Sequence, residues 1–270
     1  MSTNRTNGYD LTHYTAELYD RQITATDDVE LLRKLIGDRG PLRILEPFCG
    51  TGRVLIPLAR DGHTLVGLDQ AVSMLALARS KVQELPSEAQ ERISLREVDV
   101  TGGPWPTGFD LVILGGNCFY ELATPEEQER IVAYAARSLR PGGHVYVDND
   151  HMEGELAESW REPGTRPGGL FGACADGTQV ESRMETLGYD APRRLVKFRR
   201  SIRIIAPAGE VTEHEYLQQK HPVSTGEVRG WLKQHGFTVE ALYGDREGTP
   251  YTADSPRAIF WARKAPAAGT

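Results

Sequence analysis

Two glycines and an aspartate have the types and spacing needed to hold a nucleoside that carries an anionic group. Gly50 and Gly52 separate a strand-like run from a helix-like run within ILEPFCGTGRVLIPLA (44–59). Glycine lets the backbone approach a ligand that a Cβ would obstruct, and N–H groups at the start of the following helix attract a carboxylate or phosphate. Asp69 ends the next apolar run nineteen residues after Gly50, a spacing at which an acid binds ribose hydroxyls.

The same stretch argues against a dinucleotide. The third glycine of a GxGxxG motif would fall at Leu55, so the dehydrogenase fingerprint is incomplete. A NAD(P)-dependent oxidoreductase is therefore the distant alternative. The structural alternative is a tight turn that binds no ligand.

Segments with strand and helix character alternate from Leu42 onward, which is typical of a parallel sheet covered by helices. The expected strands are 42–48, 63–69, 93–100, 109–116, 144–150, 237–244 and 255–264. The expected helices are 53–62, 71–85, 125–143 and 225–237. The pattern predicts an α/β fold with a doubly wound, seven-stranded, mostly parallel, Rossmann-like sheet whose last strand is antiparallel. Ligands of such a sheet bind at the carboxyl ends of its strands.

This alternation stops between 151 and 224. Residues 152–169 are polar and broken by glycine and proline, which predicts a loop with one helical turn at most. Residues 193–223 alternate between apolar and polar positions around a turn at 207–209, which predicts a long antiparallel hairpin. We interpret the hairpin as an inserted lid over the strand ends.

Composition and charge exclude several classes of protein. The chain has 270 residues, a formal net charge of −7 and a pI of about 5.6, without the basic footprint of a nucleic-acid binder. Its three cysteines form no CxxC motif, which suits reduced thiols and indicates no metal site. The first residues, MSTNRTNGYD, have no apolar core, so we expect no signal peptide there, and no stretch reaches the roughly eighteen apolar residues of a membrane span. We expect a soluble, cytoplasmic monomer or homodimer with neither a nucleic-acid nor a membrane partner.

Five motifs occur in order in the first part of the chain, namely EPFCGTG, GLDQAVSMLALA, REVDV, FDLVILGGN and LRPGGHVYVD. Together they resemble the motif series of class I S-adenosylmethionine (SAM)-dependent methyltransferases, closely over 42–150 and loosely in the last two strands. The resemblance implies SAM as cofactor, S-adenosylhomocysteine (SAH) as product and a small molecule as methyl acceptor. Two residues depart from the family pattern: Glu46 replaces the commoner aspartate, and Phe48 stands where many members have the first glycine.

The cofactor residues are carried over by position. They are Glu46, Cys49, Gly50 and Gly52 at the methionine end, Asp69 at the ribose, Gln70, Met74, Asp99 and Val100 at the adenine, and Gly115 with Gly116 at the sulfonium. In such enzymes an N-terminal helix often places a tyrosine against SAM, because an aromatic face attracts a sulfonium. Tyr14 and Tyr19 are the candidates, and the alternative is that they only pack the helix on the sheet.

The resemblance also implies a division of the chain into five parts. They are an N-terminal helical cap over the cofactor (1–40), the SAM-binding α/β core (41–150), the lid and substrate insertion (151–224), the C-terminal part of the core (225–264) and a disordered tail (265–270).

The acceptor is indicated by the segment that follows the fourth strand. GGNCFYEL is similar to the Gly-Asn-Ser-Phe element of glycine and sarcosine N-methyltransferases, which implies that Asn117 binds substrate. Their carboxylate-binding arginine falls here on Asp150, which would repel a free amino-acid carboxylate. Together with Asp148 and Glu121, this acid favours a cationic acceptor. We expect N-methylation of a small amine, such as an amino sugar, in specialised metabolism.

An ammonium acceptor must lose a proton before methylation, which requires a base. Tyr120, His151 and His214 are the candidate catalytic residues, and Asn117, Glu121, Asp150 and Tyr216 are the candidate substrate residues. The nearest alternative is an O-methyltransferase for a phenol or carboxylate, with His151 or His214 as base. A SAM-binding module without catalytic activity is a further alternative.

Overall fold

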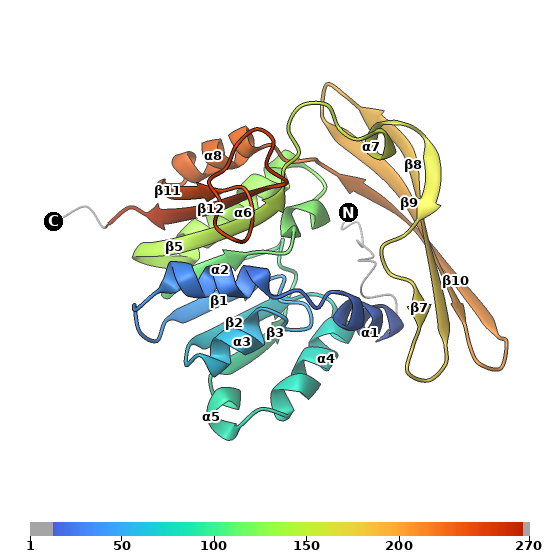
Figure 1. Cartoon of the computed structure of the whole chain (residues 1–270), viewed down its shortest axis with the longest axis horizontal. Coiled ribbons are helices and arrows are strands. Elements are labelled where there is room, and N and C mark those ends of the chain that lie inside the picture. Colours follow the sequence, from blue (N-terminus) through green and yellow to red (C-terminus); the bar gives the residue numbers. More distant parts are fainter. Residues whose placement is uncertain (1–12, 267–270) are drawn as a thin grey trace.

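The computed structural model describes residues 13–266 and contains two β-sheets (Figure 1). The larger sheet has seven strands in the order β11-β12-β5-β4-β1-β2-β3. Their bounds are β1 Arg43–Pro47, β2 Thr64–Asp69, β3 Ile93–Glu97, β4 Phe109–Leu114, β5 Leu139–Asp150, β11 Phe237–Tyr243 and β12 Arg257–Lys264. Only the pairings of β12 with β5 and β11 are antiparallel in this sheet. The predicted fold class, including the antiparallel last strand, is confirmed.

Helices cover both faces of this sheet. One face packs against α2 (Asp27–Ile36), α3 (Leu55–Arg60), α4 (Val72–Gln83) and the short α5 (Ser87–Gln90). The other face packs against α6 (Pro125–Ser138) and α8 (Thr225–Gln234). Helix α8 begins with a capping box in which Ser224 and Glu227 satisfy each other's backbone N–H groups.

Helix α6 is shorter than the sequence predicted. It ends at Ser138, and β5 begins at Leu139, where the backbone is already extended with ψ 140°. Pro141 explains the difference, because a proline disfavours helical conformation in the residue before it. The predicted helix end at 143 was wrong, and the fifth strand starts five residues earlier than the expected 144.

The smaller sheet has five strands, four of them in the order β10-β9-β8-β6, with β7 paired to β8. Their bounds are β6 Gly164–Pro167, β7 Gly172–Ala173, β8 Gln179–Asp190, β9 Leu195–Ile205 and β10 Val211–Lys220. The predicted hairpin is confirmed as β9 and β10, and the expected single helical turn is α7 (Glu158–Arg161). Strand β8 was not predicted, because its polar residues give it no clear apolar alternation.

Helix α1 (His13–Gln22) lies between the two sheets (Figure 1). Its Leu18 packs into the smaller sheet with Val180 and Ile202, whereas its Ala16 packs against Met74 of α4. Residues 1–12 of the expected N-terminal cap and residues 267–270 of the expected tail lie outside the described residues. The helix thus connects the smaller sheet to the carboxyl ends of the parallel strands.

Gly67 in β2 is a close-packing position that the sequence analysis did not single out. A Cβ there would lie 2.7 Å from Cys49 Sγ, 2.7 Å from Leu55 Cδ1 and 2.9 Å from Leu95 Cδ2. We expect Gly67→Ala to lower the free energy of unfolding by about 1–3 kcal/mol, as overpacked cores do. Thermal unfolding followed by circular dichroism measures the change. Gly188→Ala in β8 is the control, because a Cβ there meets nothing within 4 Å and should leave the melting temperature unchanged.

Candidate active site

The loop after β1 contains three residues in the left-handed region, at Phe48 (φ 62°), Gly50 (φ 53°) and Gly52 (φ 77°). A Cβ on Gly50 would meet nothing within 4 Å, so this glycine faces open space, whereas one on Gly52 would lie 3.2 Å from Ile56. Phe48 keeps the conformation that a glycine would adopt with less strain, at a cost of roughly 1–2 kcal/mol. Its ring packs against the core beneath α6 and α8, which offsets that cost.

Asp69 fixes this loop from the end of β2. Its Oδ2 accepts a hydrogen bond from the Gly50 N–H (2.8 Å), and its Oδ1 accepts one from the Ala71 N–H (2.9 Å). The side chain is buried, which raises the pKa of Asp69, although these backbone hydrogen bonds oppose the rise. Each carboxylate oxygen has a second lone pair, so Asp69 can still accept hydrogen bonds from a ligand.

Glu46 is a buried carboxylate with an unsatisfied oxygen. Among the described residues its Oε2 has no hydrogen-bond partner. Burial raises the pKa of Glu46 to about 8, although nearby Arg53 opposes the rise. A buried acid without a donor is costly unless a ligand supplies one. A cationic group such as the ammonium of an amino acid suits this position, so the residues present fit the amino-acid end of SAM.

Helix α1 is attached to the glycine loop through Asp20. The hydroxyl of Thr51 donates to Asp20 Oδ1 (2.7 Å), and Lys81 of α4 donates to the same oxygen (2.6 Å). Tyr19 packs beside Met74 on the loop side of the helix, where burial raises its pKa. Tyr14 instead donates from its hydroxyl to Asp176 (3.1 Å), beyond β7. The two tyrosines therefore face different parts of the molecule, and contact of either with SAM stays a prediction.

The other predicted cofactor residues follow the carboxyl ends of neighbouring strands. Asp99 is exposed after β3, and its Oδ1 accepts from the N–H (2.9 Å) and the hydroxyl (2.7 Å) of Thr101. Gly115 and Gly116 follow β4, and a Cβ on Gly116 would meet nothing within 4 Å. The rest of the set comprises Cys49, Met74 and Val100, which are buried, and Gln70, which is half-buried. Their roles in binding SAM stay predictions.

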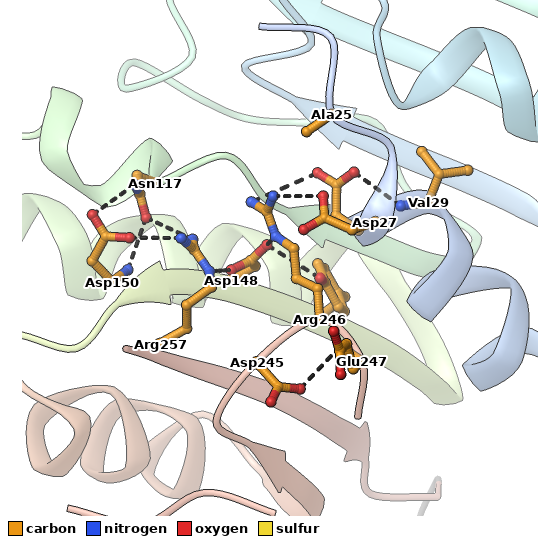
Figure 2. A network of polar contacts seen from close by, with 12 residues as sticks. Ala25, Asp27, Val29, Asn117, Asp148, Asp150, Asp245, Arg246, Glu247 and Arg257 are labelled. Atoms are coloured by element: carbon orange, nitrogen blue, oxygen red, sulfur yellow. Dashed lines mark hydrogen bonds and ion pairs between the residues drawn. The ribbon is translucent and has the colours of Figure 1, made fainter. Parts of the chain in front are cut away.

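A network of ion pairs crosses the ends of β4, β5 and β12 (Figure 2). Arg257 donates from Nε to Asp148 Oδ1 (2.6 Å) and from Nη1 to Asp150 Oδ1 (2.6 Å). Its Nη2 donates to Asn117 Oδ1 (2.9 Å), and Asn117 Nδ2 donates to Asp150 Oδ2 (3.0 Å). Asp150 is therefore an ion-pair partner of an arginine, and it brings that positive charge beside Asn117.

The same network continues toward the glycine loop. Arg246 donates from Nε to Asp148 Oδ2 (2.9 Å) and from Nη1 to Asp27 Oδ1 (3.0 Å), as Figure 2 shows. Asp28 lies 3.8 Å from Arg246 and accepts a hydrogen bond from Arg53 Nη1 (2.8 Å). Sequence reasoning missed Arg246 and Arg257. The register of β12 on β5 pairs Arg257 with Asp150, and nothing in the local sequence indicates that register.

A small hollow lies between the smaller sheet, α1 and the short helix η1 (Cys118–Glu121). Its polar lining consists of Thr15, Glu121, Ser182, Arg200, Tyr216 and Gln218. Leu170 and Ile202 add apolar surface. Two of the predicted substrate residues, Glu121 and Tyr216, are thus brought together although they are far apart in the sequence.

The three predicted bases occupy different environments. Tyr120 is buried and donates from its hydroxyl to the carbonyl oxygen of Asp150 (3.2 Å), and burial strongly raises its pKa. Its phenol therefore keeps its proton, which disfavours the role of base. His151 Nδ1 lies 2.9 Å from the Tyr251 hydroxyl. His214 is half-buried on β10, two residues before Tyr216 and on the same face of the strand. Roles for both histidines stay predictions.

Residues 13–266 contain neither a metal-ligand group nor a membrane-spanning helix. No three His, Cys, Asp or Glu side chains there form a group that could hold a metal ion. None of the helices in that range is both long and apolar enough to cross a membrane.

This chain is similar to several methyltransferases. Residues 44–143 match the family model for a methyltransferase domain. The cypemycin N-terminal methyltransferase of a Streptomyces species is 26% identical over 213 residues, or 78% of this chain and 79% of the relative. The glycine/sarcosine N-methyltransferase of Aphanothece halophytica is 24% identical over 262 residues, or 92% and 86%. The sugar N-methyltransferase KedS8 of a Streptoalloteichus species has a similar fold (TM-score 0.68, 18% identity, 92% of this chain and 91% of that one).

Proposed function

We propose that this chain, which is a class I SAM-dependent methyltransferase, transfers the methyl group to the amine nitrogen of a small molecule. SAM supplies a methyl group activated by its sulfonium. The enzyme has to hold the acceptor in line with that methyl group, to remove a proton from an ammonium acceptor and to exclude water.

The cofactor would bind along the carboxyl ends of β1 to β4. Glu46 would pair with its ammonium, because Oε2 of this buried acid lacks a donor. Asp69 would accept from the ribose hydroxyls while it holds the Gly50 N–H. Asp99 would accept from the adenine amino group. Tyr19 is the better placed of the two tyrosines to face the sulfonium, because it lies on the side of α1 that carries the glycine loop.

The hollow beside η1 carries the proposal for the acceptor. Glu121 supplies a carboxylate that attracts a cation, and Tyr216 offers an aromatic wall. Hydroxyl and amide groups of Thr15, Ser182 and Gln218 can hydrogen-bond several hydroxyl groups of one ligand. The lining also includes Arg200, whose Nε donates to Gln218 Oε1 (3.1 Å). An acid, an aromatic ring, this guanidinium and several neutral polar groups suit an amine that also carries hydroxyls, such as an amino sugar. The sugar N-methyltransferase of similar fold supports the same substrate class.

The ion-pair network changes the role first proposed for Asp150. Both of its carboxylate oxygens already accept hydrogen bonds, one from Arg257 and one from Asn117. We propose that Asp150 holds these two side chains in place and that Glu121 is the acid that meets the acceptor. Arg257 pairs with Asp150 and also lies beside Asn117. The negative charge of Asp150 is therefore compensated and no longer argues against a carboxylate on the acceptor.

A panel of small molecules incubated with enzyme and SAM tests the function. The panel comprises amino sugars, aliphatic amines, amino acids and phenols, and mass spectrometry detects the gain of one methyl group. We expect methylation of an amino sugar on nitrogen, located by fragmentation of the product. Methylation only of a phenol or carboxylate oxygen would establish the O-methyltransferase alternative instead.

Binding of SAH should become tighter as the pH rises from 6 to 8. The pKa of Glu46 is raised to about 8, so a proton must leave before the carboxylate can pair with the ligand's ammonium. The affinity should increase by up to about tenfold per pH unit below pH 8 and level off above it. Isothermal titration calorimetry measures this dependence.

Glu46→Gln provides the control for this dependence. It should bind SAH more weakly at pH 8 and with little change between pH 6 and pH 8. In the ligand-free wild type, folding stability changes with pH in the opposite direction to SAH affinity. An acid whose pKa is raised by folding costs stability as the pH increases from its ordinary pKa of 4.5 toward about 8. A wild-type affinity that is flat with pH would contradict the role of Glu46.

A further inference from the structure

Lys220 is a buried lysine beside the hollow, and it has no role in the proposed binding of SAM or of the acceptor. It is 8% exposed at the end of β10, and its Nζ lies 5.9 Å from the centre of the Tyr120 ring. Side chains alternate between the faces of a strand, so Lys220 shares a face with Tyr216 and Gln218, which both line the hollow. Lys220 therefore follows Tyr216 and Gln218 on the face of β10 that lines the hollow, at the end of the strand near η1.

The amine of Lys220 has no hydrogen-bond acceptor in the described part of the chain. Its ionic partner is Glu121, whose Oε1 lies 3.9 Å from Nζ, beyond hydrogen-bonding distance. Lys264 provides a contrast, because its Nζ donates to the carbonyl oxygens of Ala136 (2.5 Å) and Leu139 (2.7 Å). A lysine that served only the structure would be expected to have such acceptors, since an unpaired buried ammonium is costly.

We propose that the side-chain amine of Lys220 accepts the proton that an ammonium acceptor must lose, with Glu121 as the group between them. This inference rests on the proposed function. Glu121 lines the hollow and would receive the acceptor's ammonium group. The acceptor's N–H bond breaks and leaves its electron pair on the acceptor nitrogen, while the Glu121 carboxylate takes up the proton. Glu121 then passes this proton to the lone pair of Lys220 Nζ, which forms the new N–H bond. The proton then passes from Lys220 to solvent.

The charges around Lys220 favour the neutral amine that this step requires. Burial lowers the pKa of Lys220, Arg200 on β9 lowers it further, and Glu121 on η1 opposes both effects. Tyr120, the other titratable group that faces it from η1, stays protonated because burial raises its pKa. An acceptor ammonium in the hollow would repel a second ammonium nearby, so one proton has to leave.

Thermal unfolding of Lys220→Met tests this state of the lysine without any acceptor. A lysine whose pKa is lowered by folding costs stability at neutral pH, and the cost disappears as the pH rises toward the pKa of the unfolded chain. We expect Lys220→Met to melt higher than the wild type at pH 7, by on the order of 2–4 °C, and the difference to shrink by pH 9.5. Lys197→Met, on the exposed face of β9, is the matched control and should change little. A lower melting temperature for Lys220→Met at pH 7 would show a structural lysine and overturn the proposal.

The pH profile of methyl transfer tests the proton transfer itself, with the amine of the panel that the wild type methylates. Lys220→Met should lose about 10²–10⁴-fold in kcat/KM at pH 7 and recover as the pH approaches the acceptor's own pKa. Lys220→Arg keeps the charge but cannot accept a proton at these pH values, so it should remain impaired throughout. An unchanged profile in Lys220→Met would overturn the proposal. If the wild type methylates no amine, the proposed function fails, and the thermal comparison still decides whether Lys220 is held for a purpose other than stability.

Discussion

Replacement of Asp148 by asparagine should destabilise the protein by about 3–5 kcal/mol, the usual cost of removing one partner from a buried ion pair. Asp148 is fully buried and accepts hydrogen bonds from Arg257 (2.6 Å), Arg246 (2.9 Å) and the Tyr146 hydroxyl (3.2 Å). Asparagine has the same shape but no charge, so it leaves two largely buried guanidinium groups without their shared counter-ion. The melting temperature should fall by on the order of 10 °C.

The comparison for Asp148→Asn is Asp190→Asn, at the end of β8. Asp190 is half-exposed and lies 3.9 Å from Arg193, and an exposed pair of this kind contributes little. Circular dichroism or calorimetric melting of both variants measures the difference. If the two variants melt within a degree of each other, the ion-pair network of Figure 2 contributes no more than a surface salt bridge.

Replacement of Asp69 by alanine should weaken the binding of SAH by about 10²–10⁴-fold. Hydrogen bonds to a charged group contribute roughly 1.5–3 kcal/mol each, and the proposed role includes one bond to each of two ribose hydroxyls. The same substitution removes the acceptor that holds the Gly50 N–H, so the glycine loop also loses its anchor. Isothermal titration calorimetry with SAH measures the loss.

Asp38→Ala, an exposed substitution after α2, is the matched control for Asp69→Ala and should bind SAH like the wild type. Addition of SAH at 100 times its Kd should stabilise the wild type by about 2.7 kcal/mol and leave the thermal stability of Asp69→Ala nearly unchanged. Wild-type affinity in Asp69→Ala would mean that the ribose is held elsewhere. Stabilisation by NADH instead of SAH would refute the assignment of the glycine loop to SAM.

The alternation of strands and helices and the glycine loop after the first strand could be predicted from the sequence, because both depend on short-range patterns. Apolar runs with a period of two or 3.6 residues identify strands and helices, and the glycines with Asp69 identify the ligand loop within a few residues of chain. The wrong predictions concerned the boundaries of elements and strands with a weak apolar pattern. Helix α6 ended at Ser138, shortly before Pro141, and β8 was missed because few of its residues are buried.

Glu121 and Tyr216 were named as substrate residues from the sequence, but their meeting in one hollow depends on how the smaller sheet packs beside η1. Nothing in the sequence around Lys220 indicated a chemical role for this residue. A lysine at the end of a polar strand is usually solvated, and only the packing of β10 against η1 buries this one.

By itself, the sequence determined the alternation of strands and helices that forms a mostly parallel sheet, and a glycine loop after the first strand, because such features depend on residues that are close together in the chain. The tertiary structure decided which charges share the site. Arg257 reaches Asp148 across 109 residues, and only the antiparallel register of β12 on β5 brings the two together. Burial then gives these groups their chemistry, since a carboxylate or an amine shifts its pKa according to the solvent and charges that the fold removes or places around it.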